Sequence, residues 1–177
     1  MPVAAYMLSL LARQRALLGD RFLERYPSNW LVWEPGVWRP ARSASTSNTE
    51  QTQLPTPVPF SRPGNDDALC FELKRVAAEL SVGRGTENAI VVNDLTVSRT
   101  HLLLEFAAEK WTLKTTGLVT VDGKPVGATG AQLLNSTVIG IGDVRMTFYD
   151  PRGFNVRLAP QTPPPSIGVR PPGSTHR

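Results

Sequence analysis

The sequence predicts an all-β fold, an antiparallel β-sandwich, for residues 66–152. Between residues 68 and 150, short segments of about five to nine residues, several of them alternating apolar and polar, are separated by turn residues. No segment with helical periodicity interrupts this region, and Pro125 is its single proline. Asp122-Gly123 stands between two of the predicted strands and predicts a type I′ hairpin, because glycine tolerates a positive φ.

Residues 1–40 form a predicted N-terminal extension that begins with an amphipathic helix over residues 3–26. A stripe along this helix combines Met7, Leu11, Leu18 and Phe22. We expect the stripe to pack on the domain or on a second copy of the chain, so self-association through the extension is one interpretation. Docking on a membrane surface is disfavoured, because acidic residues share the polar side of the helix.

The stretch "YPSNWLVWEPGVWRP" completes the extension and holds three of the four tryptophans of the chain. Its prolines prevent a long helix. Exposed tryptophans at this density are unfavourable, so they either cover an apolar patch of the same chain or form a partner surface. We favour docking on the same chain.

Two proline-containing segments flank the predicted sandwich. Residues 41–65 are polar and rich in threonine and proline, which predicts a flexible, disordered linker. Residues 153–177 are predicted to be a disordered proline-rich tail with polyproline character and without core residues.

Composition excludes several classes of protein. The net charge of +4 comes from 19 basic and 15 acidic residues without a run of more than two basic ones, which disfavours nucleic-acid binding and suits a local anion site. The lone Cys70 excludes a disulfide framework and a thiol-rich metal site. No apolar run has the length of a membrane span, and the N-terminus lacks the basic region and cleavage site of a secretion signal. We expect a cytoplasmic protein that binds no membrane, metal or cofactor.

Catalysis is equally disfavoured. The chain has two histidines, His101 and His176, and no pair of carboxylates at a recognisable spacing. "VGRGTEN" lacks the G-x-x-x-x-G-K-[ST] pattern of a nucleotide-binding loop. We therefore expect a binding protein and not an enzyme.

The segment "LSVGRGTENAIVVNDLTVSRTH", residues 80–101, brackets a short apolar strand with two arginine-bearing turns. If the chain between the two turns crosses the sandwich and then returns, Arg84 and Arg99 reach the same end of the sandwich. Guanidinium groups offer paired donors that suit phosphate, and Ser98 adds a hydroxyl and a backbone N–H. The pattern predicts a pocket for one phosphate, with ordinary surface arginines as the alternative.

Three stretches resemble the forkhead-associated (FHA) domain, a phosphothreonine-binding β-sandwich: "VGR" at 82–84, "NDLTVSRTH" at 93–101 and "LLNSTVIGIGDVRMTFYD" at 133–150. The resemblance covers about residues 68–150. It implies that Arg84 hydrogen-bonds the phosphate and that Ser98 adds its hydroxyl. It also implies that Arg99 contacts the phosphate or the peptide backbone beside it.

The same resemblance implies supporting roles for other residues. His101 is expected to be an internal brace that holds the loops bearing Gly83 and Ser98. Gly83 is expected where the backbone needs glycine. Asn93 and Asp94 are expected to shape the turn that precedes the Ser98 loop.

The next loop departs from the family pattern. Thr116 matches the expected hydroxyl, but Gly117 stands where the family has an asparagine that clamps the main chain of the bound peptide. Its loss weakens binding by about 1–3 kcal/mol. Either the peptide is bound more weakly or by other residues, or the domain binds proteins without phosphate. Residues 124–132 are expected to form the loop that distinguishes partners.

The favoured function is a phosphothreonine-dependent protein–protein interaction module, a signalling adaptor downstream of a Ser/Thr kinase. Its partners are then a phosphothreonine-containing protein and the kinase. The alternative is a phosphate-independent scaffold or assembly subunit whose main interface is the Trp-rich extension. A third, less favoured hypothesis is recognition of a modified threonine in the linker, which offers Thr46, Thr49, Thr52 and Thr56.

Overall fold

The computed structural model of the protein describes residues 2–38, 67–75 and 79–160. Within these residues the chain forms twelve β-strands and three helices. The strands are β1 Ala5–Met7, β2 Asn29–Trp33, β3 Leu69–Leu73, β4 Leu80–Gly83, β5 Ile90–Val91, β6 Leu102–Ala107, β7 Lys110–Thr115, β8 Val119–Val121, β9 Lys124–Pro125, β10 Ala131–Leu133, β11 Thr137–Ile141 and β12 Val144–Tyr149. The helices are α1 Leu8–Leu18, α2 Arg21–Arg25 and α3 Pro151–Arg157.

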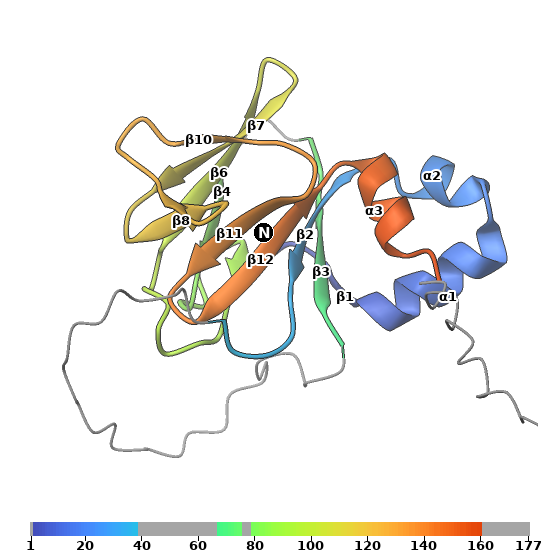
Figure 1. The fold of residues 1–177 in the computed structure, drawn as a ribbon, viewed down its shortest axis with the longest axis horizontal. Helices are drawn as coiled ribbons and strands as arrows, with labels where there is room; N and C mark the ends of the chain where they lie inside the picture. Colours follow the sequence, from blue (N-terminus) through green and yellow to red (C-terminus); the bar gives the residue numbers. More distant parts are fainter. Residues whose placement is uncertain (1, 39–66, 76–78, 161–177) are drawn as a thin grey trace, which may run out of the picture.

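The strands form two sheets that pack face to face, which confirms the predicted β-sandwich (Figure 1). One sheet has seven strands in the order β1-β3-β2-β12-β11-β8-β9, and the other has five in the order β10-β7-β6-β4-β5. Neighbouring strands are antiparallel except for β4 and β5, which are parallel. The main core lies between the sheets, where inward side chains of both interdigitate.

Strand β2 is buried on both of its faces. Leu31 and Trp33 point into the core between the sheets, whereas Trp30 and Val32 point to the opposite side. Such a strand shows no alternation in its sequence, because neither face meets water. Its neighbours in the sheet are β3 and β12, so the segment "NWLVW" is an inner strand of the sandwich.

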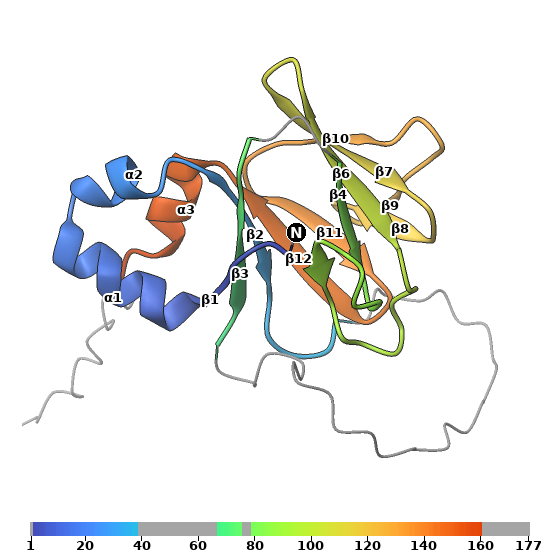
Figure 2. The same cartoon turned by 180° about the vertical axis from the view of Figure 1, so that it is seen from behind.

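The three helices form a third layer beside the β1-β3-β2 side of the larger sheet (Figures 1 and 2). Leu11 of α1, Phe22 of α2 and Phe154 of α3 are buried there with outward side chains of β2 and β3. The rings of Trp30 and Phe154 stack with their centroids 4.5 Å apart. This second core includes Cys70, and burial raises the pKa of its thiol.

The predicted single helix over residues 3–26 is wrong in three respects. Residues 5–7 are extended and pair with β3. The helix then breaks at Gly19, whose φ of +54° ends α1 before α2 begins. Of the four residues of the predicted stripe, Leu11 and Phe22 are buried, but Met7 and Leu18 are 42% and 37% exposed.

The structure also differs from the predicted division into extension, sandwich and tail. The extension supplies β2, so the sandwich begins well before residue 66. Because Trp30 and Trp33 are fully buried, they cannot form an exposed partner surface. At the other end α3 extends the ordered domain beyond residue 152, and Phe154 and Leu158 belong to the second core.

Several expectations concern residues that the structure does not describe. The predicted linker at 41–65, its threonines and most of the predicted tail lie outside the described residues. Within the ranges that are described, no helix is long and apolar enough to cross a membrane. No group of three or more potential metal ligands occurs in those ranges either.

The Asp122-Gly123 turn has the predicted conformation. It joins β8 to β9, with Val121 paired to Lys124 across the hairpin. Both turn residues have positive φ, +48° at Asp122 and +77° at Gly123, as a type I′ turn requires.

We predict that Trp33→Ala lowers the free energy of unfolding by about 3–5 kcal/mol, because it removes a fully buried ring from the main core. Urea denaturation followed by circular dichroism measures this loss. Leu17→Ala is the control, since Leu17 is 86% exposed and its loss changes stability by no more than about 0.5 kcal/mol. A loss below about 1 kcal/mol for Trp33→Ala contradicts the placement of β2 inside the sandwich.

Candidate anion-binding site

The parallel pairing of β4 and β5 brings the two arginine-bearing turns to one end of the smaller sheet. Val82 pairs with Ile90 and Gly83 with Val91, so the chain leaves both strands at the same end. Arg84 directly follows β4, and Ser98-Arg99 lies in the loop that follows β5 and leads into β6. The strand between the arginines therefore returns the chain to the end at which Arg84 lies.

Backbone hydrogen bonds join the two turns directly. The Arg84 N–H donates to the Ser98 carbonyl at 3.0 Å, and the Gly85 N–H donates to the Arg99 carbonyl at 3.0 Å. Gly83 permits this approach, because a Cβ at that position would overlap the Arg99 carbonyl oxygen and lie 2.8 Å from the Thr100 Cα. The glycine before Arg84 is thus needed for close backbone packing.

Asn88 is a further bridge between the turns, and our sequence analysis missed it. Its side-chain amide donates to the carbonyl oxygens of Gly85 and Arg99, at 2.8 and 2.5 Å, and its Oδ1 accepts from the Thr100 hydroxyl at 3.2 Å. The residue is 3% exposed. A buried asparagine immediately before an apolar strand is a weak sequence signal, since such residues need internal partners.

His101 links the Ser98 turn to the loop between β7 and β8. Its Nδ1 accepts from the Ser98 N–H at 3.0 Å, and its Nε2 lies 2.9 Å from the Leu118 carbonyl oxygen. These partners assign the proton to Nε2, which then donates to Leu118. The ring thus contacts the Ser98 turn as expected, but its second hydrogen bond goes to Leu118 and not to the Gly83 turn.

This arrangement corrects one part of the predicted pocket. The Ser98 N–H is already donated to His101, so it is not free to donate to a phosphate. The Ser98 hydroxyl is the group that the turn presents, on an exposed residue.

Thr116 and Gly117 form the third turn at this end. The Thr116 N–H donates to the His101 carbonyl at 3.1 Å, and its hydroxyl donates to the Thr100 carbonyl at 2.9 Å. Gly117 is half-buried against the His101 ring, where an added Cβ would lie 3.2 Å from Nε2. The third turn is therefore held against the loop that carries Ser98 and Arg99.

The turn before Ser98 is held by Asp94. Its Oδ1 accepts from the backbone N–H of Thr96 at 2.9 Å and from the Thr96 hydroxyl at 2.6 Å. Asn93 is half-buried beside it at the start of the same loop.

The exposed groups at this end can bind an anion. Arg84, Ser98, Arg99 and Thr116 are all exposed. Within the described part of the chain, neither arginine forms an ion pair. One acidic group lies next to the Arg84 turn: the Glu87 carboxylate packs against Gly85, where it fills the space that a Cβ on residue 85 would need. The Thr116 hydroxyl already donates to Thr100, so the site offers two cations and the Ser98 hydroxyl, with one carboxylate at its border.

Residues 63–152 match the family model described as "Inner membrane component of T3SS, cytoplasmic domain". No curated protein matches the chain.

Three similar solved structures are FHA domains. That of the CT664 protein from Chlamydia trachomatis has 17% identity and a TM-score of 0.45, and the match covers 70% of this chain and 98% of that one. An Arabidopsis thaliana FHA domain has 19% identity and a TM-score of 0.47, with coverage of 70% and 86%. The third comes from work on phosphothreonine-dependent FHA domain interactions and has 25% identity, a TM-score of 0.41, and coverage of 45% and 82%.

We predict that Asn88→Ala destabilises the fold by about 1–3 kcal/mol, because it leaves the Gly85 and Arg99 carbonyl groups without their side-chain donor. Chemical denaturation gives the change. Thr86→Ala, at an exposed position of the same turn, is the control and is expected to be nearly neutral. Equal stability of the two variants would show that the amide does not hold the turns together.

Proposed function

Because the chain belongs to the family of the cytoplasmic domain of an inner membrane component of T3SS, and its sandwich is of the FHA type, we propose that it is a phosphothreonine-dependent protein–protein interaction module. In this proposal the module performs no catalysis, and its ligand is a phosphothreonine within a partner protein.

The observation that carries the proposal is the joining of three polar turns at one end of the sheet. Arg84, Ser98 and Arg99 are exposed on turns whose backbones are hydrogen-bonded to one another. Thr116 is tied to the same loop through Thr100. A phosphate brings a charge of about −2 to this end, and the two guanidinium groups complement that charge. An unmodified threonine offers no charge, so it is expected to bind poorly.

The wider role follows from the chemistry of the ligand. A phosphothreonine arises through a Ser/Thr kinase, so the module acts as an adaptor downstream of such an enzyme. The cytoplasmic location expected from the sequence is part of the proposal, and the family description, which speaks of a cytoplasmic domain, supports it.

A second candidate function is phosphate-independent assembly. Two observations favour it: Gly117 lacks a side chain to clamp a bound peptide, and the Ser98 N–H is engaged with His101. The family description of a secretion-system component also suits an assembly role. In this second candidate the interface lies outside Trp30 and Trp33, which are fully buried.

The two functions differ in their dependence on Arg84. We predict that Arg84→Ala weakens phosphothreonine-peptide binding by at least about tenfold, because a charge-assisted hydrogen bond to phosphate contributes about 1.5–3 kcal/mol. Fluorescence polarisation with a degenerate phosphothreonine library and matched unphosphorylated peptides measures this. Lys110→Ala is the charge-matched control, since Lys110 lies at the other end of β7.

Phosphate-dependent binding that survives in Lys110→Ala and is lost in Arg84→Ala supports the phosphothreonine-dependent module. A folded protein that binds no phosphopeptide, or binds equally with and without phosphate, rules out this function and leaves phosphate-independent assembly as the remaining candidate.

A second prediction concerns Gly117. We expect Gly117→Asn to strengthen phosphopeptide binding by about tenfold, since a side-chain amide gains hydrogen bonds to the peptide main chain. Gly117→Ala is the matched control, because it adds the Cβ close to His101 without the amide. If both variants bind alike, the amide at this position makes no contact with the peptide.

A further inference from the structure

Helix α1 carries an apolar stripe that the fold leaves uncovered. Leu10, Leu17 and Leu18 of α1 and Met7, the last residue of β1, are exposed by 37–86%. At about 100° per residue the three leucines of α1 fall on one side of the helix. Leu11, which is 0% exposed, lies at the edge of the same side and packs in the second core. The apolar side of the helix is thus packed at one edge and meets solvent over the rest.

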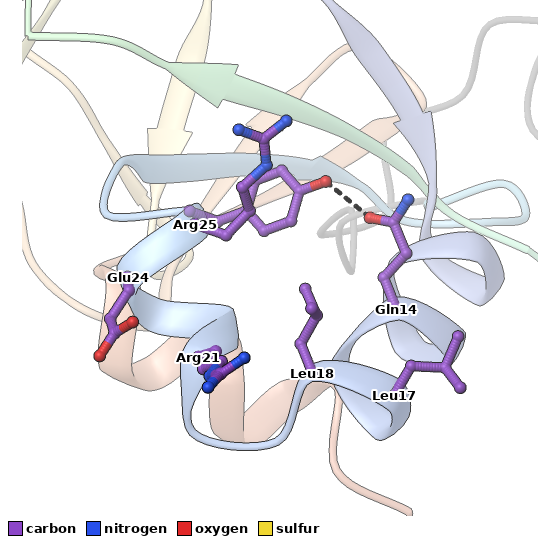
Figure 3. A pocket seen from close by; sticks show the side chains of 7 residues that line it. Gln14, Leu17, Leu18, Arg21, Glu24 and Arg25 are labelled. Atoms are coloured by element: carbon purple, nitrogen blue, oxygen red, sulfur yellow. Dashed lines mark hydrogen bonds between the residues drawn. The ribbon is translucent and has the colours of Figure 1, made fainter.

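An open hollow of about 570 Å³ lies beside this stripe, between α1 and α2 (Figure 3). Leu18 points into it from α1, and Tyr26 forms part of its wall. The Tyr26 hydroxyl donates to the Gln14 side chain at 2.7 Å, which fixes the aromatic wall against α1. Leu17, Leu18 and Tyr26 therefore form an apolar part of the hollow that can accept side chains of another molecule.

The polar border of the hollow is mainly cationic. Arg21 and Arg25 line it from α2, and both are exposed. Neither forms an ion pair among the residues that the structure describes. Glu24 also lines it but lies on the outer side of α2 (Figure 3). Asp20, which directly precedes α2, is the one other acidic residue between the start of α1 and the end of α2.

We propose that this hollow and the stripe of α1 form a groove for an amphipathic helix of another protein. That helix presents apolar residues spaced three and four apart to Leu17, Leu18 and Tyr26. Acidic residues beside its apolar face lie against Arg21 and Arg25. The groove is separate from the arginine turns and needs no phosphate.

Charge distinguishes this occupant from the two nearest alternatives. The two long segments of this chain outside the described residues carry a net positive charge: residues 39–66 hold three arginines against Glu50 and Asp66, and residues 161–177 hold two arginines and no acidic residue. A second copy of the chain has the same net charge of +4 and the same cationic border. Neither complements Arg21 and Arg25 as an acidic helix does.

Three synthetic 16-residue peptides test the groove. The first carries leucines at helical i, i+3, i+4 and i+7 spacing with glutamates beside them; the second replaces the glutamates by lysines, and the third replaces the leucines by alanines. Each is titrated into the isotope-labelled full chain, and backbone amide shifts are followed by NMR. We expect the glutamate–leucine peptide to shift amides of α1 and α2, and the other two peptides to leave them unchanged.

Variants of the chain test the same contacts. The double variant Arg21→Glu/Arg25→Glu is expected to bind the acidic peptide about tenfold more weakly and to gain binding of the lysine peptide. Leu17→Asp, at an exposed position, is expected to weaken binding of the acidic peptide without unfolding the protein. Lys110→Glu, on the β6–β7 hairpin, is the charge-changing control.

Three results overturn the proposal. The first is equal binding of the acidic and lysine peptides to the unchanged chain, and the second is the absence of shifts in α1 and α2. The third is occupation of the stripe by a second copy of the chain or by a membrane. The first of these would appear as dimerisation in sedimentation and the second as binding to phosphatidylserine vesicles, each abolished by Leu17→Asp. Arg84→Ala should leave every groove measurement unchanged, so failure here is distinct from failure of phosphopeptide binding.

Discussion

Burial of β2 on both faces is the constraint on which the rest of the structure depends. Its inward residues complete the core between the sheets, and its outward residues form the wall on which the three helices pack. Trp33 serves the first core and Trp30 the second. A polar residue at any of these positions would leave an unpaired group in one core or the other. The two cores are therefore coupled through the backbone of one short strand.

The framework of the proposed anion site consists of buried side chains and backbone hydrogen bonds. Gly83, Asn88 and His101 are buried, and between them they hold three turns together by close packing and hydrogen bonds. Arg84 and Arg99 are exposed on this framework. A framework fixed in advance reduces the loss of conformational entropy when a ligand binds. The flexible guanidinium groups retain freedom to adapt to the position of the phosphate.

The sequence predicted the sandwich well where one face of a strand meets water, as in β6 and β7, and where a turn has a specific signal, as at Asp122-Gly123. It missed β2, because a strand buried on both faces lacks alternation. It missed α3 although Asp150 before Pro151 is a helix-start signal, and Asp150 does accept from the Gly153 N–H. The partners of Asn88 and of the Ser98 N–H depend on turns far apart in the sequence, so no local pattern reveals them.

The order of strands in the larger sheet has a consequence for biosynthesis. Strand β2 lies between β3 and β12, and Trp33 pairs with Met146 near the other end of the domain. A chain emerging from the ribosome therefore exposes "NWLVW" long before its second neighbour exists. Pairing across such a separation is slow, and an apolar strand that waits unpaired is prone to aggregate. Trp30 and Trp33 thus remain beside an unpaired strand edge until the last strand has been made.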